Sequence, residues 1–275
     1  MLRTVSAVRY VTPLREGGSL PALVEANDDG LYVVKLRGAG QGPKALVAEL
    51  VAGELARALE LPVPELVFVE LDEHLPDAEP DPEIQELLAA SSGTNVGLDF
   101  LPGALPYAPG GSFAVKPDLA AAVVWLDAFV ENVDRTARNV NLLIWHRRLW
   151  LIDHGAALYR HHAGLDPAAA RGRFPAVREH VLLDTAASIA EADAELAPRV
   201  TPELLGQVLD GEVIQPKRSP RSRRAIGPAE SSPAATCSIS IRWARMPSRS
   251  TSGHSRPRRS ASTVVRAPRN RWRGE

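Results

Sequence analysis

The stretch DRTARNVNLLIWHRRLWLIDHG at residues 134–155 predicts a loop followed by a β-hairpin. Residues 140–145 and 149–152 are rich in apolar, β-branched and aromatic side chains, and His146-Arg147-Arg148 separates them as a turn. A helix over residues 117–132 is expected to lead into the loop. The stretch thus belongs to a mainly helical region with an embedded hairpin.

Three polar side chains mark the two ends of this stretch. Asn139 follows Asp134 by five residues, and Asp153 follows Asn139 by fourteen. Phosphoryl transfer needs a carboxylate beside the acceptor hydroxyl, and Mg²⁺ prefers carboxylate and amide oxygens. The spacing predicts Asp134 as the base and Asn139 and Asp153 as metal ligands. The alternative reading is an Asn-capped turn and a solvated Asp turn.

The first half of the chain is predicted to be rich in strands. Residues 31–36, LYVVKL, form an apolar, β-branched strand after the turn signal NDDG. A helix over residues 43–60 follows, with apolar residues at helical spacing and Pro43 in its first turn. The sequence LPVP at residues 61–64 ends it, because proline cannot continue a helix.

Lys35 and Glu49 suggest a phosphate-binding half of the site. Lys35 stands in the apolar strand, where an ammonium is costly unless it is paired or near solvent. Its functional role would be to hold the α- and β-phosphates of ATP; the alternative is an edge-strand lysine facing water. Glu49, close to the apolar face of the next helix, is the candidate partner of Lys35, and Glu54 is its rival.

Gly17-Gly18-Ser19 precedes the lysine strand and could cover phosphates with its backbone N–H groups. It fits neither the P-loop pattern nor the dinucleotide-binding pattern. Residues 38–42, GAGQG, are expected to be a flexible connector.

The remaining patterns favour an α+β arrangement of two lobes. Strands are expected at residues 66–71 and 96–101, with an acidic, Pro-rich loop at 72–82 between them, and helical segments near 167–171, 175–192 and 202–210. The linker at residues 102–111 is the boundary between the lobes. We expect a nucleotide-binding N-lobe at 1–101, a C-lobe with the catalytic loop and metal site at 102–212, and a basic tail at 213–275.

The tail differs sharply from the rest in charge. Residues 216–275 hold 15 of the 32 basic residues and only 2 of the 33 acidic ones, which leaves 17 basic and 31 acidic residues before them. This Arg-, Ser- and Pro-rich segment cannot bury enough apolar surface to fold, so we expect it to be disordered. A frameshifted reading of a GC-rich gene is a second hypothesis, which resequencing across the junction would test.

Composition indicates a cytoplasmic protein. The single cysteine, Cys237, excludes an intramolecular disulfide framework and a multi-cysteine zinc site. No signal peptide is recognised, and the longest apolar run, at residues 119–126, is far too short to span a bilayer.

With these residues identified, the chain resembles the HipA-like kinase family over about residues 5–210. The matching stretches are YVVK at 32–35, the helix from Ala48-Glu49 to the LPVP ending, DRTARN at 134–139 and IDHG at 152–155. The resemblance implies a two-lobed protein-kinase-like fold with ATP between the lobes and adenine near residues 99–101. It also implies that Glu49 pairs with Lys35.

The chain departs from the family pattern in three places. We expect it to lack the N-terminal subdomain of full-length toxin members, so toxin biology is not expected to carry over. Asp153-His154-Gly155 replaces the Asp-Phe-Gly of ordinary protein kinases, so the usual conformational switch has no support. The family's C-terminal helices should continue past residue 212, where this chain turns into the basic tail.

Three classes of function follow. The leading one is an ATP- and Mg²⁺-dependent phosphotransferase with a protein serine or threonine hydroxyl as acceptor, or else a small molecule or lipid headgroup. The second is a catalytically impaired, kinase-like nucleotide-binding protein. The third is a nucleic-acid binder in which Trp243 and Trp272 of the basic tail stack on bases; the acidic remainder of the chain and the lack of a recognisable motif argue against it.

Overall fold

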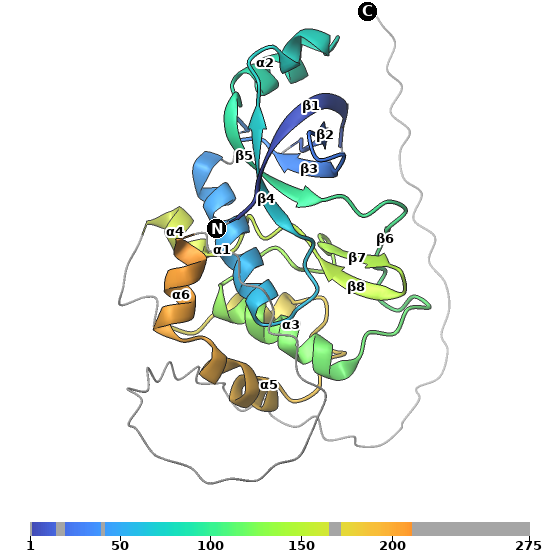
Figure 1. Ribbon diagram of the computed structural model, residues 1–275. Coiled ribbons are helices and arrows are strands. Elements are labelled where there is room, and N and C mark those ends of the chain that lie inside the picture. Colours follow the sequence, from blue (N-terminus) through green and yellow to red (C-terminus); the bar gives the residue numbers. More distant parts are fainter. Residues whose placement is uncertain (1, 15–19, 40–41, 165–171, 211–275) are drawn as a thin grey trace, which may run out of the picture. The chain divides into compact units, whose positions relative to one another are not determined.

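The computed structural model describes residues 2–14, 20–39, 42–164 and 172–210. Its first lobe is built on a sheet of five strands. The strands are β1 (Thr4–Pro13), β2 (Ala22–Ala26), β3 (Leu31–Lys35), β4 (Leu66–Leu71) and β5 (Gly93–Asp99). Their order is β1-β2-β3-β5-β4, and every neighbouring pair in this order is antiparallel. The sheet curls so that residues 4–6 of β1 pair in parallel with β4. Figure 1 shows this sheet with α1 (Gly42–Ala58) below it.

The core of this lobe consists of β-branched side chains on the inner face of the sheet. Val24, Val34, Val67 and Val69 are fully buried there. Gly97 of β5 is required by this packing, because a Cβ atom at that position would lie 2.6 Å from Cγ2 of Val69. The strand that carries Lys35 is therefore held firmly between its neighbours.

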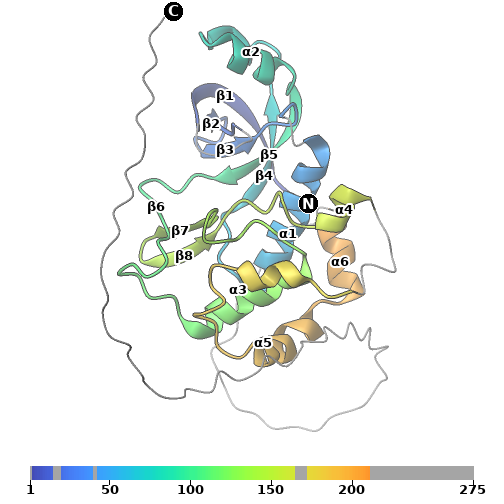
Figure 2. The same ribbon diagram turned by 180° about the vertical axis from the view of Figure 1, so that it is seen from behind.

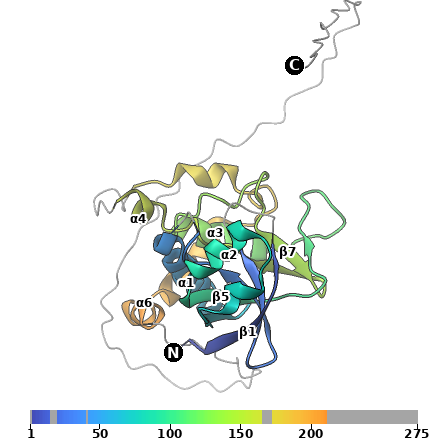
Figure 3. The same ribbon diagram turned by 90° about the horizontal axis from the view of Figure 1, so that it is seen from above.

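Helix α1 lies beside α6 (Pro202–Leu209), as Figure 3 shows from above. Hydrogen bonds attach both of its ends to the helical lobe. Near its start, Lys44 Nζ donates to the backbone oxygen of His161, 3.1 Å away, in α4 (Tyr159–Ala163). At its end, Arg199 Nη2 donates to the backbone oxygen of Ala58 over 3.3 Å.

The second lobe centres on α3 (Pro117–Phe129), which packs against α5 (Ile189–Leu196); both are visible in Figure 2. Residues on all sides of α3 are buried, as expected for a helix at the centre of a lobe. Trp125 is fully buried, stacks on Phe129 and donates from Nε1 to Asp193 of α5 over 2.6 Å. No helix in the described part of the chain has the length and apolar character to cross a membrane.

The hairpin forms as predicted, with a shorter turn. Strands β7 (Leu142–Trp145) and β8 (Arg148–Leu151) pair antiparallel, and β6 (Leu105–Pro106) adds to β7. Only His146 and Arg147 form the turn, both with positive φ, since a two-residue turn of this hand suits the twist of the strands.

The structure corrects three expectations about secondary structure. The predicted loop at residues 72–82 contains the 3₁₀ helix η1 (Leu75–Ala78), and α2 (Pro82–Ala89) follows it with Asp81 as N-cap. The predicted helix over 175–192 is divided into η3 (Pro175–Glu179) and α5, and η4 (Ala197–Arg199) follows. Strand β5 begins three residues earlier than expected. The helical segment predicted at 167–171 and the tail lie outside the described residues.

Candidate functional site

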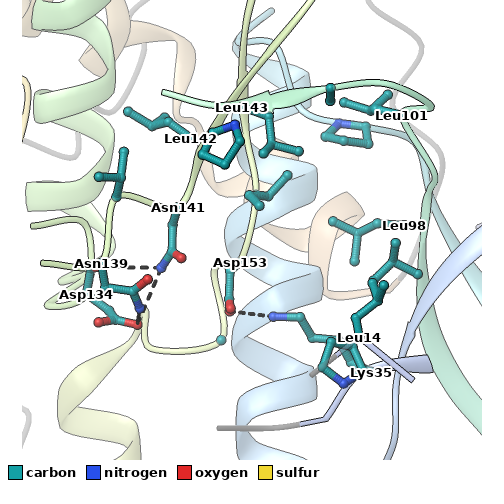
Figure 4. A pocket seen from close by; sticks show the side chains of 18 of the residues that line it. Leu14, Lys35, Leu98, Leu101, Asp134, Asn139, Asn141, Leu142, Leu143 and Asp153 are labelled. Carbon is teal, nitrogen blue, oxygen red and sulfur yellow. Dashed lines mark hydrogen bonds and ion pairs between the residues drawn. The ribbon is translucent and has the colours of Figure 1, made fainter. Parts of the chain in front are cut away.

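Lys35 joins the two lobes through ion pairs. It is the last residue of β3, and its Nζ lies 2.7 Å from Oε2 of Glu49 on α1. The same ammonium contacts Oδ1 of Asp153, which follows the hairpin (Figure 4). Glu54, the other candidate partner, is bonded to Arg57 instead, at 2.7 Å. The strand, the helix and the segment after the hairpin thus meet at one cation.

Burial decides how these charges behave. Burial alone would lower the pKa of the Lys35 ammonium, but the carboxylates of Glu49 and Asp153 outweigh it and raise that pKa. Burial would likewise raise the pKa of Glu49, but Lys35 and the neighbouring His154 hold it far below its ordinary value. Each group therefore keeps the other charged, so the site presents an ammonium ion at neutral pH.

The other half of the site is the loop of Asp134. Asn139 Nδ2 donates to Asp134 Oδ2 over 2.7 Å, and Asn141 Nδ2 approaches the same oxygen at 3.4 Å. Asn132 accepts from the backbone N–H of Asp134 at 3.1 Å. These bonds fix the carboxylate of Asp134, and the bond from Nδ2 fixes the amide of Asn139 beside it.

A buried ion pair attaches this loop to α3. Asp127 of α3 accepts from Arg135 Nε at 2.6 Å, and both side chains are almost wholly buried. Burial would raise the pKa of Asp127, but the charge of Arg135 and a contact with His180 hold it far below its ordinary value. The residue next to Asp134 is thereby anchored in the centre of the lobe.

These carboxylates give the protein a defined response to acid. The pKa values of Glu49 and Asp127 are lower in the folded state than their ordinary values of 4.5 and 3.8, so their contribution to stability is complete above these values and is lost as the pH falls below them. We expect the free energy of unfolding from urea titrations to decrease steadily from pH 5 to pH 3. The slope should be shallower for Glu49→Gln. A free energy that is equal at pH 7 and pH 3 would contradict this assignment.

Asp153 adopts a left-handed backbone conformation, with φ of 55°. Aspartate tolerates this conformation better than most residues. His154 is fully buried against α1, where its Nδ1 lies 3.5 Å from Oε1 of Glu49. The turn therefore sends consecutive side chains in different directions: Asp153 towards Lys35 and His154 into the protein.

One cavity of about 1320 Å³ is lined by side chains from both lobes. Lys35, Asp134, Asn139 and Asp153 all line it, and Figure 4 shows them around its interior. Its remaining walls are largely apolar and include residues 98–101 at the end of β5, together with Leu142, Leu143 and Ile152. The cavity combines an apolar wall with charged groups at one end.

The oxygen-bearing side chains of this cavity suit an open Mg²⁺ site, in which few ligands come from the protein, better than a site made wholly of protein ligands. In the part of the chain that the structure describes, no three His, Cys, Asp or Glu side chains gather into a metal site. Magnesium is commonly held by one or two protein oxygens and completes its shell with water and phosphate. Asp153 and Asn139 could supply such oxygens.

The structure brings together five of the eight residues predicted for the site: Lys35, Glu49, Asp134, Asn139 and Asp153. Gly17, Gly18 and Ser19 lie outside the described residues. Sequence reasoning missed Asn141 and the buried partners Asp127, Arg135 and His180. The sequence could have indicated Asn141 as a site residue, since a polar residue directly before an apolar strand is unusual enough to suggest a functional role. Asp127 and His180 carried none, because their roles depend on contacts between distant segments.

The chain is similar to two solved kinase structures and matches one family model. A crystal structure of the Helicobacter pylori proinflammatory kinase CtkA aligns with a TM-score of 0.49 and 12% identity, over 79% of this chain and 89% of that one. The Golgi casein kinase aligns with a TM-score of 0.41 and 15% identity, over 76% and 67%. No curated protein matches significantly. The model of the HipA-like kinase family matches residues 7–171, more than half of the chain, and the chain therefore belongs to this family.

Proposed function

We propose that this chain is an ATP- and Mg²⁺-dependent kinase that phosphorylates serine or threonine hydroxyls of proteins. The observation that carries the proposal is that Lys35, Asp134, Asn139 and Asp153, from three separate segments, line the same cavity. This set contains a cation for phosphates, a carboxylate for the acceptor and oxygens for a metal. Family membership supports the reaction class.

The cavity has room for both substrates. Small-ligand pockets usually enclose about 300–1,000 Å³, and this one is larger, at about 1320 Å³. The adenine would lie on the apolar wall near residues 98–101, and the phosphates would extend towards Lys35. The acceptor would then enter beside Asp134.

The residues have distinct roles in the transfer. The acceptor oxygen attacks the γ-phosphorus, the bond from that phosphorus to the β,γ-bridging oxygen breaks, and ADP leaves. Asp134 accepts the proton of the hydroxyl, while Lys35 holds the α- and β-phosphates. Mg²⁺, when bound by Asn139 and Asp153, would neutralise charge on the phosphates.

Transfer of labelled γ-phosphate from ATP tests the proposal. Purified protein is incubated with a library of Ser/Thr peptides, with Mg²⁺ or with a chelator, beside Asp153→Asn. We expect Mg²⁺-dependent labelling of peptides, and at least a tenfold higher Mg²⁺ requirement for the variant, since even outer-shell changes cost 10–100-fold at metal sites. Equal turnover with and without metal, or in both proteins, would refute it. Labelling of lipids or small molecules alone would reassign the acceptor.

A further inference from the structure

We propose that His180 is a positioning residue of this site and that it acts through Asp127 and Arg135 on both metal-binding segments. His180 follows η3, beyond the residues matched by the family model. The inference rests on the proposed function for its catalytic consequence, but the structural link itself can be tested without activity.

Arg135 is the link between the two segments. Its Nη1 donates to the backbone oxygen of Asn141, two residues after Asn139, and to that of Ile152 at 3.3 Å, one residue before Asp153. One guanidinium therefore fixes the distance between the loop of Asn139 and the turn of Asp153. A rotation of this group would displace both proposed metal ligands together.

Asp127 determines where the guanidinium lies. Its Oδ2 accepts from Arg135 Nε, and its Oδ1 accepts from Asn132 Nδ2 at 2.9 Å. His180 Nε2 lies 2.9 Å from the same Oδ2, so the carboxylate is held from three sides. All four side chains are buried, so water does not compete for these bonds.

The second nitrogen of His180 also has a defined partner. Nδ1 accepts from the backbone N–H of Leu182 at 3.0 Å. With Nδ1 as an acceptor, Nε2 is the nitrogen that donates to Asp127. The ring is thus held at both nitrogens, and it orients the carboxylate of Asp127.

The backbone around His180 also holds the catalytic loop. The N–H of Val181 donates to the oxygen of Arg135 over 3.0 Å, and His180 and Thr136 form an isolated β-bridge. Leu182 is fully buried and anchors the segment. Side chain and backbone together make residues 180–182 a support for the loop of Asp134.

Two amide substitutions separate the side-chain role from a general effect on folding. In His180→Gln, the amide nitrogen of glutamine can still reach Asp127, whereas the amide of the shorter asparagine in His180→Asn cannot. We expect His180→Asn and His180→Ala to lower kcat about 10–100-fold and to raise the Mg²⁺ requirement, as for other outer-shell groups. His180→Gln should keep a kcat and a Mg²⁺ requirement close to those of the wild type. Leu88→Ala, in the core of the other lobe, controls for lost stability alone.

Hydrogen–deuterium exchange supplies the readout that needs no activity. We expect faster exchange in peptides covering residues 134–141 and 150–155 in His180→Asn, but not in His180→Gln or Leu88→Ala. If the wild type transfers no phosphate, the proposed function fails while exchange still decides this inference. The inference would be overturned if these peptides exchanged at the wild-type rate in His180→Asn, or if the Gln and Asn variants changed their exchange equally. If His180→Ala does not fold, the two amide variants decide.

Discussion

Replacing Asp134 by Asn should reduce kcat by about 10²–10⁴, the contribution typical of a positioned general base. Asparagine is nearly isosteric and can still accept the hydrogen bond that Asn139 Nδ2 donates over 2.7 Å. The loop should therefore keep its shape while the group that accepts the proton is lost. The affinity for Mg²⁺–ATP should change little, because the role proposed for Asp134 is with the acceptor hydroxyl and not with the phosphates.

Steady-state kinetics with saturating peptide acceptor, together with nucleotide binding by calorimetry, would measure both effects. Asp118→Asn is a suitable control, since Asp118 is an exposed acid in the first turn of α3 that does not line the cavity. A variant that keeps more than one tenth of the wild-type kcat would remove Asp134 from the role of base. A large loss of nucleotide affinity would instead point to a role in metal binding.

Replacing Asp127 by Ala should decrease the free energy of unfolding by about 3–5 kcal/mol, because the change leaves the buried charge of Arg135 without its partner. The guanidinium is fully buried and lies 2.6 Å from the carboxylate in the intact protein. His180 and Asn132 would lose a hydrogen-bond acceptor as well. The loss should therefore exceed that of ordinary substitutions in this lobe.

Urea denaturation at pH 7 would measure this loss, with Glu25→Ala as the matched control. Glu25 also pairs with an arginine, Arg9, at 2.7 Å, but the Arg9 side chain is exposed and that of Glu25 is only half-buried. An exposed pair of this kind contributes about 0–1 kcal/mol. If both variants lost the same free energy, Asp127 and Arg135 would not form the central support of the loop of Asp134.

Local patterns explain what the sequence could predict. Lys35 was placed correctly on a strand because its apolar neighbours and the preceding turn are adjacent in sequence. The spacing of Asp134, Asn139 and Asp153 spans one loop and one hairpin, so it too can be read without knowledge of distant contacts. Helix α2 was missed although Asp81 and Pro82 are recognised start signals, because the acidic, Pro-rich composition favoured a loop.

Distant contacts explain what the sequence could not predict. Residues 175–192 were expected to form one helix, but His180 and Val181 turn towards Arg135 and interrupt it. The support formed by Asp127 and His180 joins residues 53 positions apart. A pattern based on periodicity or motif spacing has no means of pairing such residues, since burial selects the partners only after the lobe has packed.

The fixed ends of α1 have a consequence for regulation. Protein kinases are commonly switched by movement of the helix that carries the glutamate partner of the strand lysine. Here that helix is held near its start by the bond from Lys44 to His161 and at its end by the bond from Arg199 to Ala58. An outward swing would have to break both attachments and expose the buried carboxylate of Glu49. Helix α1 is therefore expected to move together with the helical lobe, and any separation of the two would have to open the Lys35–Glu49 pair.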